Sequence, residues 1–510
     1  MHTWHSAQDA AVWLRSRVTG ELRTDSRLVQ AGDGFIAWPG AATDGRRYLA
    51  QALARGASAC LMEELGHGTW LNALQSPDPA ALACMPGLKA QTAWVADAYY
   101  EQPSRALQVL AVTGTNGKTS TAWWLAQALS SPVLQQACGL VGTLGVGQLP
   151  DLVSTGMTTP DPVLLQRQFR QFADDGVTHC AIEASSIGLA EHRLDGTHIR
   201  VAVFTNFTQD HLDYHGDMAQ YWSAKAALFA WPGLQSAVIN IDDAQGVLLA
   251  QQLQGGSLDV WTCSRRGAAR LQARALPSAQ GLAFEVIEGQ TVQTLHTGLI
   301  GDYNIDNLLG VIGSLRALGF DLTQAVQACA QLTAVPGRME RVPLDLPGTQ
   351  PDDASPLVVV DYAHTPDAIT QALAALRSQA AQRGGRLWCV LGCGGDRDAS
   401  KRPLMAAAAE AAADQVLLTS DNPRSESPEA IVAAMVQGLR HPQSVQIQLD
   451  RALAIDEALA QAAAQDVVLV AGKGHESEQE IMGVRHPFSD VAQARAALQR
   501  RAAQHQGVPA

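Results

Sequence analysis

The stretch VLAVTGTNGKTSTAWW (residues 109–124) constrains this chain most, because an apolar run leads into a Gly-rich turn, a Lys-Thr pair and a helical pattern. In a phosphate-binding loop of this layout, backbone N–H groups of the turn and the positive end of the helix dipole face one anion. We expect Lys118 to reach the β- and γ-phosphates of a nucleotide, and the Thr119 hydroxyl to hold Mg²⁺. Val112 stands where the strict pattern has Gly, so the loop is a variant, and a chance Gly-rich turn is the alternative. The candidate phosphate-binding residues are Gly114, Thr115, Asn116, Gly117, Lys118 and Thr119.

Length and composition indicate a globular protein of several domains. At about 150 residues per domain, 510 residues suggest three or four domains, and we predict three, at 1–90, 91–336 and 337–510. No apolar run approaches the roughly 18 residues of a membrane span, and the first residues lack the pattern of a secretion signal. A formal charge of −13 argues against a nucleic-acid partner, because counterion release needs clustered Lys and Arg.

The eight cysteines are scattered, and only Cys389 and Cys393 lie close together in the sequence. Without a second pair or a His cluster, they do not form a zinc-binding pattern. Reduced thiols fit better, and they favour a cytoplasmic protein.

Alternating strands and helices predict an α/β fold. The first region predicts a small α/β domain. In the middle region the strands VLAVTG, HCAIEAS, VAVFTN and SAVIN predict a parallel sheet of the P-loop ATPase type, with ligands at the carboxyl ends of its strands. Short alternating strands from Leu271 to Ile300 predict a small β appendage. The last region, with LVVVDYAH, LWCVLGCGG, QVLLTSDNP and VVLVAGKG, predicts a doubly wound, Rossmann-like sheet, and residues 346–356 predict a surface loop.

Two strand ends beside the phosphate loop carry groups suited to a metal ion or a phosphoryl group. Glu183 and Ser185 follow the strand HCAIEAS, while Asp210 and His211 lie in the polar turn after VAVFTN. A carboxylate and an imidazole there could ligate Mg²⁺ or orient the transferred phosphoryl group. Taken singly, Glu183 could be the partner of a helix N-cap, and His211 could be a hydrogen-bonded turn residue. Together with the phosphate loop, they favour phosphoryl transfer.

The motifs TGTNGKT, EASS, DHLDYHG, GDYNIDN, PGRME and DYAHTPDA, in this order, resemble those of the Mur ligases, the ATP-dependent amino-acid-adding enzymes of peptidoglycan synthesis. The resemblance covers nearly the whole chain. More narrowly, TDSR, GCGGDRD, DNPR and GKGHE resemble motifs of the tripeptide synthetases in that family. The resemblance implies one domain that holds UDP, a central ATPase domain, and a C-terminal domain that brings the incoming amino acid.

The resemblance also implies a phosphorylated intermediate. ATP phosphorylates the γ-carboxylate of D-Glu in UDP-MurNAc-L-Ala-D-Glu, and the amine of the incoming amino acid displaces phosphate. Because the carboxylate and ATP repel each other, the site needs Lys118 and one or two Mg²⁺ ions. The family implies that Lys225 is carbamylated, which makes it an anionic oxygen donor for Mg²⁺; an ordinary lysine on a helix surface is the alternative. The implied catalytic and metal-binding residues are Lys118, Thr119, Glu183, His211 and carbamylated Lys225.

Further residues are assigned to the two nucleotides by the same resemblance. The implied residues for the UDP-linked substrate are Ser26, Thr158, Thr159, Ser185, Glu191 and Arg193. Arg193 suits a bidentate clamp on a carboxylate or phosphate. Glu191 stands where related enzymes carry Gln, and an acid there would repel an anionic substrate unless it is paired. The implied residues for adenine and ribose are Asn304, Asn307, Arg338, Asp361 and His364, although the two asparagines could instead be helix N-caps.

The DNPR motif at residues 421–424 bears on the incoming amino acid. In the family, its Arg accompanies meso-2,6-diaminopimelate, and members that add L-lysine replace it. Arg424 can bind the extra carboxylate of diaminopimelate through two parallel hydrogen bonds, and Glu476 can pair with the distal ammonium. A generic Asp-Asn-Pro turn is the alternative. The implied residues for the amino acid are Arg397, Asp421, Asn422, Arg424, Gly472 and Glu476.

The resemblance therefore implies a cytoplasmic, ATP-dependent ligase that adds meso-2,6-diaminopimelate to the D-Glu γ-carboxylate of UDP-MurNAc-L-Ala-D-Glu, and we expect it to act as a monomer. Folylpolyglutamate synthetase, which shares the phosphate loop, is the second enzyme candidate, but it should lack TDSR and DNPR. A nucleotide-binding regulatory protein without turnover predicts damage at Lys118, Glu183, His211 or Lys225, and all four are intact.

Overall fold

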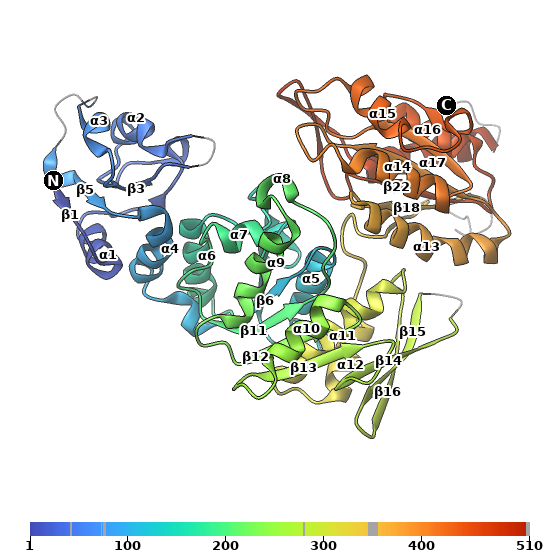
Figure 1. Cartoon of the computed structure of the whole chain (residues 1–510), viewed down its shortest axis with the longest axis horizontal. Coiled ribbons are helices and arrows are strands. Elements are labelled where there is room, and N and C mark those ends of the chain that lie inside the picture. Colours follow the sequence, from blue (N-terminus) through green and yellow to red (C-terminus); the bar gives the residue numbers. More distant parts are fainter. Residues whose placement is uncertain (41–42, 73, 75–77, 279–280, 345–354, 506–510) are drawn as a thin grey trace.

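A computed structural model describes residues 1–40, 43–72, 74, 78–278, 281–344 and 355–505. These residues form three parallel-rich sheets, one after another along the chain, and a separate hairpin (Figure 1). The predicted α/β class with three successive units is confirmed. Of the predicted loop at 346–356, residues 346–354 lie outside the described part of the chain.

The N-terminal sheet is parallel throughout and has the strand order β1-β5-β4-β3-β2. Its strands are β1 (His2–Thr3), β2 (Leu22–Arg23), β3 (Gly34–Ala37), β4 (Ala59–Glu63) and β5 (Leu82–Met85). Its helices are α1 (Ala7–Arg15), α2 (Leu49–Ala54), α3 (His67–Leu71) and α4 (Leu88–Tyr99). Strands β3, β4 and β5 are buried along their whole length, because helices cover both faces.

Helix α4 passes through the predicted boundary at residue 90. It packs against α1 on one side and, on the other, against α6 (Pro162–Asp174) of the middle region. The N-terminal unit is thus joined to the next one by a continuous helix. The domain boundaries themselves remain predictions.

The central sheet has the order β16-β15-β14-β13-β12-β11-β6-β10-β7-β8-β9. Its parallel strands are β6 (Gln108–Thr113), β7 (Cys138–Gly142), β10 (His179–Glu183), β11 (Ile199–Phe204), β12 (Ser236–Asn240), β13 (Asp259–Ser264) and β14 (Leu271–Leu276). Antiparallel strands extend both edges: β15 (Leu282–Glu288), β16 (Thr291–Thr297), β8 (Gly145–Gln148) and β9 (Asp151–Val153). The predicted β appendage, β14 to β16, therefore continues the edge of the central sheet.

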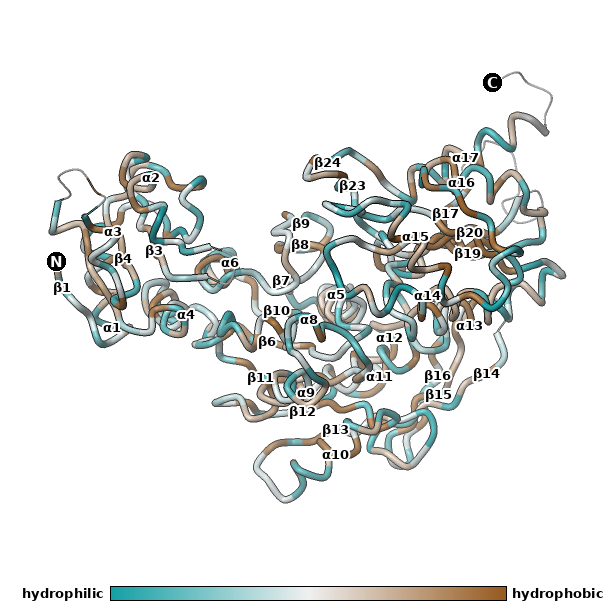
Figure 2. The backbone as a smooth tube through the Cα atoms, turned by 45° about the horizontal axis from the view of Figure 1, so that its top comes forward, coloured by the Kyte–Doolittle hydropathy of each residue, from teal (hydrophilic) through white to brown (hydrophobic). Residues whose placement is uncertain are grey.

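Helices cover both faces of this sheet and enclose two apolar cores, which explains why its strands read as continuous hydrophobic runs (Figure 2). Besides α6, the helices are α5 (Lys118–Leu129), α7 (Ser186–Ala190), α8 (Leu212–His215), α9 (Met218–Ala226), α10 (Ala244–Leu253), α11 (Tyr303–Ala317) and α12 (Leu322–Ala330).

The C-terminal sheet has the order β17-β18-β22-β19-β20-β21, and only the edge strand β17 runs antiparallel among the described strands. Its strands are β17 (Glu340–Val342), β18 (Leu357–Asp361), β19 (Leu387–Cys393), β20 (Gln415–Ser420), β21 (Gln446–Ile447) and β22 (Val467–Ala471). The separate hairpin is β23 (Glu478–Ile481) with β24 (Val484–Pro487). The helices are α13 (Pro366–Arg383), α14 (Lys401–Ala412), α15 (Pro428–Val436), α16 (Arg451–Gln461) and α17 (Asp490–His505).

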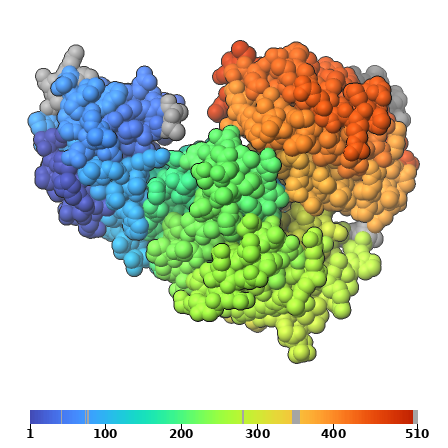
Figure 3. All heavy atoms as spheres, viewed as in Figure 1, coloured from blue at the N-terminus to red at the C-terminus, as the bar shows by residue number. Residues whose placement is uncertain are grey.

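Parallel pairing brings the predicted site residues to common edges. In the central sheet, Glu183 pairs with Val112, and Phe204 pairs with Thr113, so β10, β6 and β11 end side by side. In the C-terminal sheet, β18, β22, β19 and β20 likewise end together. Figure 3 shows the N-terminal unit (blue) and the C-terminal unit (orange) on either side of an open space above the central unit (green). Of the helices that the structure describes, none has the length and apolar character required for a membrane crossing.

A fully buried ion pair holds the C-terminal unit together. Arg451 donates to both carboxylate oxygens of Asp490 at 2.7 Å, and both side chains are 0% exposed. Arg451 also donates to the backbone oxygens of Ser420 (3.1 Å) and Ala471 (2.9 Å), at the ends of β20 and β22. The pair therefore fixes two helices against the ends of two strands.

We expect Asp490→Ala to lower the free energy of unfolding of the C-terminal unit by about 3–5 kcal/mol, because it leaves the Arg451 guanidinium buried and unpaired. Urea unfolding measures the change. Asp456→Ala, which removes the acid of an exposed pair with Arg500 between the same two helices, α16 and α17, is the control and should cost less than about 1 kcal/mol. Equal losses in the two variants would contradict the anchoring role of the buried pair.

Candidate functional site

The loop between β6 and α5 turns sharply and docks on the segment after β11. Gly114 and Gly117 have φ angles of +148° and +85°. The N–H of Thr115 donates to the backbone oxygen of Asn206 (2.9 Å), and the N–H of Asn116 donates to its side-chain oxygen (2.8 Å). Two of the N–H groups predicted to face phosphates are thus bonded within the protein. The N–H groups of the first turn of α5, which have no intrahelical partner, are left for an anion.

Two lysines converge on this loop. Lys118 Nζ donates to the backbone oxygens of Gly114 (2.9 Å) and Thr115 (2.8 Å), and Lys225 Nζ donates to the same Gly114 oxygen (2.7 Å). Lys225 is 1% exposed, so the alternative of a lysine on a helix surface is wrong. Burial lowers the pKa of Lys118, and burial together with the charge of Lys118 lowers the pKa of Lys225 far below its usual value. The two side chains therefore meet at the Gly114 oxygen, beside the place where phosphates are predicted.

Glu183 lies at the carboxyl end of β10 and is 1% exposed. It accepts from the hydroxyl of Thr119 (2.9 Å) and from the backbone N–H of Thr143 (2.8 Å). The Thr143 hydroxyl joins Glu183 to Thr158, at 3.2 and 3.0 Å. Helix α7 is capped by Ser185, whose side chain accepts from Gly188, while the Glu183 carboxylate bonds to Thr119 and Thr143 instead. The hydroxyl and carboxylate predicted for Mg²⁺ are therefore adjacent.

Asp210 and His211 form an acid–imidazole pair in the turn after β11, with Nε2 and Oδ2 3.5 Å apart. Burial lowers the pKa of His211 to about 4, so its ring is neutral at neutral pH. Burial would raise the pKa of Asp210, but His211, His364 and Lys401 outweigh it and lower that pKa to about 2. Within the described part of the chain, no group of three or more His, Cys, Asp or Glu residues is placed to hold a metal ion. The predicted Mg²⁺ set, which also uses a hydroxyl and a modified lysine, stays a prediction.

Asn304 and Asn307 lie inside the first two turns of α11, whose N-cap is Asp302, so the N-cap alternative is wrong. Asn304 donates to the backbone oxygen of Ile300 (2.7 Å), and Asn307 donates to Asn304 (2.9 Å). A Cβ atom placed on Gly117 would lie 2.3 Å from Asn307 Oδ1. Helix α11 therefore presents both asparagines beside the phosphate loop.

Arg338, Asp361 and His364 approach from the start of the C-terminal unit. Arg338 Nη2 lies 3.4 Å from Thr119 Oγ1, and its guanidinium stands 4.2 Å from the centre of the Tyr362 ring. Asp361 accepts a hydrogen bond from the backbone N–H of Met339, the residue after Arg338 (2.7 Å). Burial raises the pKa of Asp361. His364 Nδ1 lies 2.7 Å from the Tyr362 backbone oxygen. The predicted adenine and ribose residues thus flank the phosphate loop from two units.

Most residues assigned to the UDP-linked substrate form one network on Glu183. The Thr159 hydroxyl donates to the backbone oxygen of Glu183 (2.6 Å) and contacts the Ser185 hydroxyl (3.0 Å). Arg193 Nη1 donates to the backbone oxygen of Thr159 (2.8 Å). These side chains therefore reach the same strand end as the predicted Mg²⁺ ligands.

Glu191, the acid that departs from the family pattern, is paired. Lys89 Nζ lies 2.7 Å from Glu191 Oε2, and the hydroxyl of Tyr214 donates to Glu191 Oε1. Burial acts to raise the pKa of Glu191, but its bonds with Lys89 and Tyr214 hold that pKa below its usual value. The carboxylate is thus compensated before any substrate binds.

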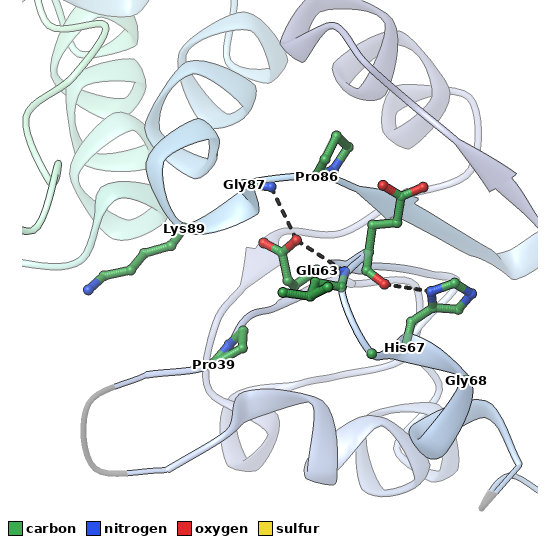
Figure 4. A pocket seen from close by; sticks show the side chains of 10 residues that line it. Pro39, Glu63, His67, Gly68, Pro86, Gly87 and Lys89 are labelled. Carbon is green, nitrogen blue, oxygen red and sulfur yellow. Dashed lines mark hydrogen bonds between the residues drawn. The ribbon is translucent and has the colours of Figure 1, made fainter.

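Ser26 stands apart from this network, in the N-terminal unit. It follows β2, is buried, and donates to Gln51 (2.8 Å). At the same carboxyl edge of this sheet lies a pocket of about 920 Å³ (Figure 4). Its lining residues are Pro39, Glu63, Glu64, Leu65, Gly66, His67, Gly68, Pro86, Gly87 and Lys89.

The residues predicted for the amino acid gather at the carboxyl edge of the C-terminal sheet. Asn422 donates to Glu476 (2.6 Å), and Arg424 Nη1 donates to the backbone oxygen of Gly395 (2.8 Å). A Cβ atom on Gly394 would lie 3.1 Å from Arg424 Nη1 and 3.7 Å from Arg397 Cγ, so both arginines border Gly394.

Two loops of the same cluster approach each other so closely at Gly472 that there is no room for a side chain at this position. A Cβ atom there would lie 2.4 Å from Asp421 Oδ2. Burial raises the pKa of Asp421, although the nearby cations Arg451 and Lys473 oppose the shift. All six predicted residues of the acceptor set are therefore brought together.

Sequence reasoning missed Lys473, which binds the acceptor loops to each other. It is 0% exposed and donates to Asn422 Oδ1 (3.0 Å), Glu476 Oε2 (3.0 Å) and the backbone oxygen of Glu478 (2.7 Å). Its signal was present, because Lys473 is the lysine of GKGHE.

Two contacts between the central and C-terminal units were also missed. Lys401 Nζ lies 3.5 Å from Asp210 Oδ1, and Asn116 donates to Asp367 at 3.3 Å. No local pattern marks Lys401, and the DYAHTPDA motif contains Asp367 without showing its partner, because both contacts form only through the packing of one unit on the other.

Two family models match the chain: the Mur ligase middle domain over residues 112–315, and the Mur ligase, glutamate ligase domain over residues 337–474. UDP-N-acetylmuramoyl-L-alanyl-D-glutamate–2,6-diaminopimelate ligase of Acidovorax sp. (strain JS42) is 59% identical over 513 residues, which cover 98% of this chain and 99% of that relative.

Among solved structures, one of a UDP-N-acetylmuramoyl-L-alanyl-D-glutamate–2,6-diaminopimelate ligase is 38% identical, with a TM-score of 0.63 and 95% of each chain covered. Folylpolyglutamate synthase of Mycobacterium tuberculosis is 21% identical, with a TM-score of 0.62, and the match covers 81% of this chain and 95% of that one. At that identity the second likeness shows the fold alone.

We expect Gly117→Ala to weaken ADP binding about 10-fold or more, measured by calorimetry, because the new methyl group would collide with the Asn307 amide in a backbone conformation that already disfavours alanine. Gly176→Ala is the matched control: its φ is +74°, but nothing lies within 4 Å of the added atom. An unchanged ADP affinity in Gly117→Ala would contradict the close fit of Asn307 against the loop.

Proposed function

The chain belongs to the Mur ligase family, and on that basis we propose that it is the ATP-dependent ligase that adds meso-2,6-diaminopimelate to the D-Glu γ-carboxylate of UDP-MurNAc-L-Ala-D-Glu in peptidoglycan precursor synthesis. Its identity of 59% to a diaminopimelate ligase extends over 98% of the chain. The observation in the structure that carries the proposal is the approach of two units at one place. Arg338 and Lys401 of the C-terminal unit reach Thr119 and Asp210 beside the phosphate loop.

The arrangement supports transfer of a phosphoryl group to a carboxylate. The loop and the first turn of α5 hold the nucleotide phosphates, and Lys118 neutralises part of their charge. Arg193 and Thr159, which are bonded to each other, hold the UDP-linked substrate at the same strand end. The carboxylate of the substrate is thereby oriented towards the γ-phosphate, and an acyl phosphate forms with release of ADP.

The oxygen atoms of Thr119 and Glu183, 2.9 Å apart, fit a hard divalent cation. When bound there, Mg²⁺ supplies positive charge that stabilises the transferred phosphoryl group. Lys225 suits carbamylation, because its buried amine has a strongly lowered pKa and the neutral amine is the form that reacts with CO₂. As a carbamate it adds an anionic oxygen donor behind Gly114.

The acceptor cluster distinguishes diaminopimelate from lysine by charge. Arg424 lies beside Arg397 and offers two parallel donors to the second carboxylate, a group that lysine lacks. Glu476, held by Asn422 and Lys473, is the counter-ion for the distal ammonium. The other amine of diaminopimelate, in its neutral form, attacks the carbonyl carbon of the acyl phosphate as the two units approach each other, so that an amide bond forms and phosphate leaves.

The proposal includes a cytoplasmic site of action and a monomeric enzyme. All eight cysteines are free and buried, in keeping with a reducing compartment. ATP and the UDP-linked substrate of the proposed reaction are small anions, which agrees with local Lys and Arg side chains in a chain of net charge −13.

ADP release by the purified protein with ATP, Mg²⁺ and UDP-MurNAc-L-Ala-D-Glu tests the function and the role of Arg424. We expect turnover with meso-diaminopimelate and little with L-lysine, and a loss of about 100-fold in kcat/KM for diaminopimelate in Arg424→Ala, from the missing charge-assisted hydrogen bonds. Arg485→Ala, which removes an exposed cation of the neighbouring hairpin, should leave kcat/KM unchanged. Equal use of both amino acids would overturn the assignment of Arg424, and no turnover with either would overturn the function.

We further expect Lys225→Ala to lower kcat about 100-fold or more, because the anionic oxygen donor is lost. Formate or acetate should restore part of the rate by supplying a carboxylate in the vacated space. Lys118→Ala removes a cation from the same Gly114 oxygen, and it should lose activity without such recovery. Absence of carboxylate rescue in Lys225→Ala, with the protein folded, would count against carbamylation.

A further inference from the structure

Lys89 and Glu191 form a contact between units that the reaction as described does not use. Lys89 lies in the first turn of α4, and Glu191 follows α7 as its C-cap. The distance from Lys89 Nζ to Glu191 Oε2 is 2.7 Å, and the Tyr214 hydroxyl donates to the other carboxylate oxygen. One acid thus fixes a lysine of the N-terminal unit against two helices of the central unit.

The location of Lys89 is between two sites that one substrate must bridge. On one side it lines the pocket at the carboxyl edge of the N-terminal sheet, and Figure 4 shows its side chain extending away from Glu63. On the other side its partner Glu191 precedes Arg193 by two residues, and Arg193 is bonded to Thr159. The side chains of Thr159, Ser185 and Arg193 form what we call the Thr159 cluster. The path from the pocket to the Thr159 cluster therefore passes the Lys89 ammonium.

The charge around the pocket makes this ammonium distinctive. Lys89 is the one Lys or Arg among the described residues that line the pocket, where the carboxylates of Glu63 and Glu64 also lie. The N–H groups at the start of α4 do not offer a second anion site, because Gly87 and Leu88 both donate to Glu63, at 3.1 and 2.7 Å. An anion that enters here needs a cation, and the Lys89 side chain is 39% exposed and accessible to it.

We propose that Lys89 binds the diphosphate of the UDP-linked substrate, and that Glu191 is a positioning residue that holds Lys89 between the pocket and the Thr159 cluster. The inference rests on the proposed function, which supplies a substrate with a diphosphate between uridine and the muramoyl group. An ammonium has three N–H donors, so Lys89 can keep its bond to Glu191 while it donates to phosphate oxygens. The acid at position 191 then serves the anionic substrate through the lysine that it holds.

The test compares Lys89→Met with the wild-type enzyme, using UDP and uridine as competitors of UDP-MurNAc-L-Ala-D-Glu. We expect Lys89→Met to raise the KM for UDP-MurNAc-L-Ala-D-Glu and the inhibition constant of UDP about 10-fold, the size of one charge-assisted hydrogen bond. The inhibition constant of uridine, which has no phosphate, and the KM values for ATP and diaminopimelate should not change. Lys89→Arg, which keeps the charge, should retain most of the affinity for UDP.

Arg15→Met is the matched control, because it removes a cation of an ion pair with Glu101 in the same unit and does not touch the pocket. If Glu191 positions Lys89, Glu191→Gln should raise the inhibition constant of UDP in the wild-type background but not in the Lys89→Met background. Equal weakening in both backgrounds would overturn that role.

Two failures can be told apart. In the first, the wild-type enzyme turns over normally, but Lys89→Met leaves the inhibition constant of UDP unchanged or raises that of uridine by the same factor. Lys89 then only joins the two units, and the inference fails. If the wild-type protein shows no turnover with UDP-MurNAc-L-Ala-D-Glu and diaminopimelate, the proposed function fails, and the inference fails with it.

Discussion

The parallel pairing of buried strands is the constraint on which the rest of this molecule depends. Because Glu183 pairs with Val112 and Phe204 with Thr113, the strands β10, β6 and β11 end at one edge, and the residues that follow them must meet. The same rule gathers the acceptor loops of the C-terminal sheet. Each sheet thus converts separate motifs of the sequence into one cluster, and helices on both faces leave this edge as the place where polar groups collect.

Buried cations stabilise these clusters and also tune them. Arg451 fixes the ends of β20 and β22 through Ser420 and Ala471, and Lys473 bonds the two acceptor loops above them. In the central unit, Lys225 and Lys118 share one backbone oxygen. Burial of charge is costly, and Arg451 and Lys473 offset that cost with several acceptors each. Lys225 bonds to one backbone oxygen and faces the Tyr221 ring, and burial lowers the pKa values of both lysines of the central unit.

In the proposed reaction the substrates are held by separate units, and side-chain contacts join those units. Arg338 and Lys401 bring the C-terminal unit to Thr119 and Asp210, while Lys89 brings the N-terminal unit to Glu191. These contacts are single ion pairs or hydrogen bonds, which can break and re-form as the units move. Such an interface suits an enzyme that must admit three substrates and then exclude water from an acyl phosphate.

The sequence by itself determined the α/β class, the succession of three sheet-bearing units, the phosphate loop and the grouping of acceptor motifs, because strand runs, Gly-rich turns and short polar motifs are local patterns. Only the tertiary structure decided that Asn206 occupies two N–H groups of the phosphate loop, that Lys225 is buried, and that Lys89 neutralises Glu191. These relations join residues far apart in the chain, and they exist only when helices and sheets pack, so no single segment carries a signal for them.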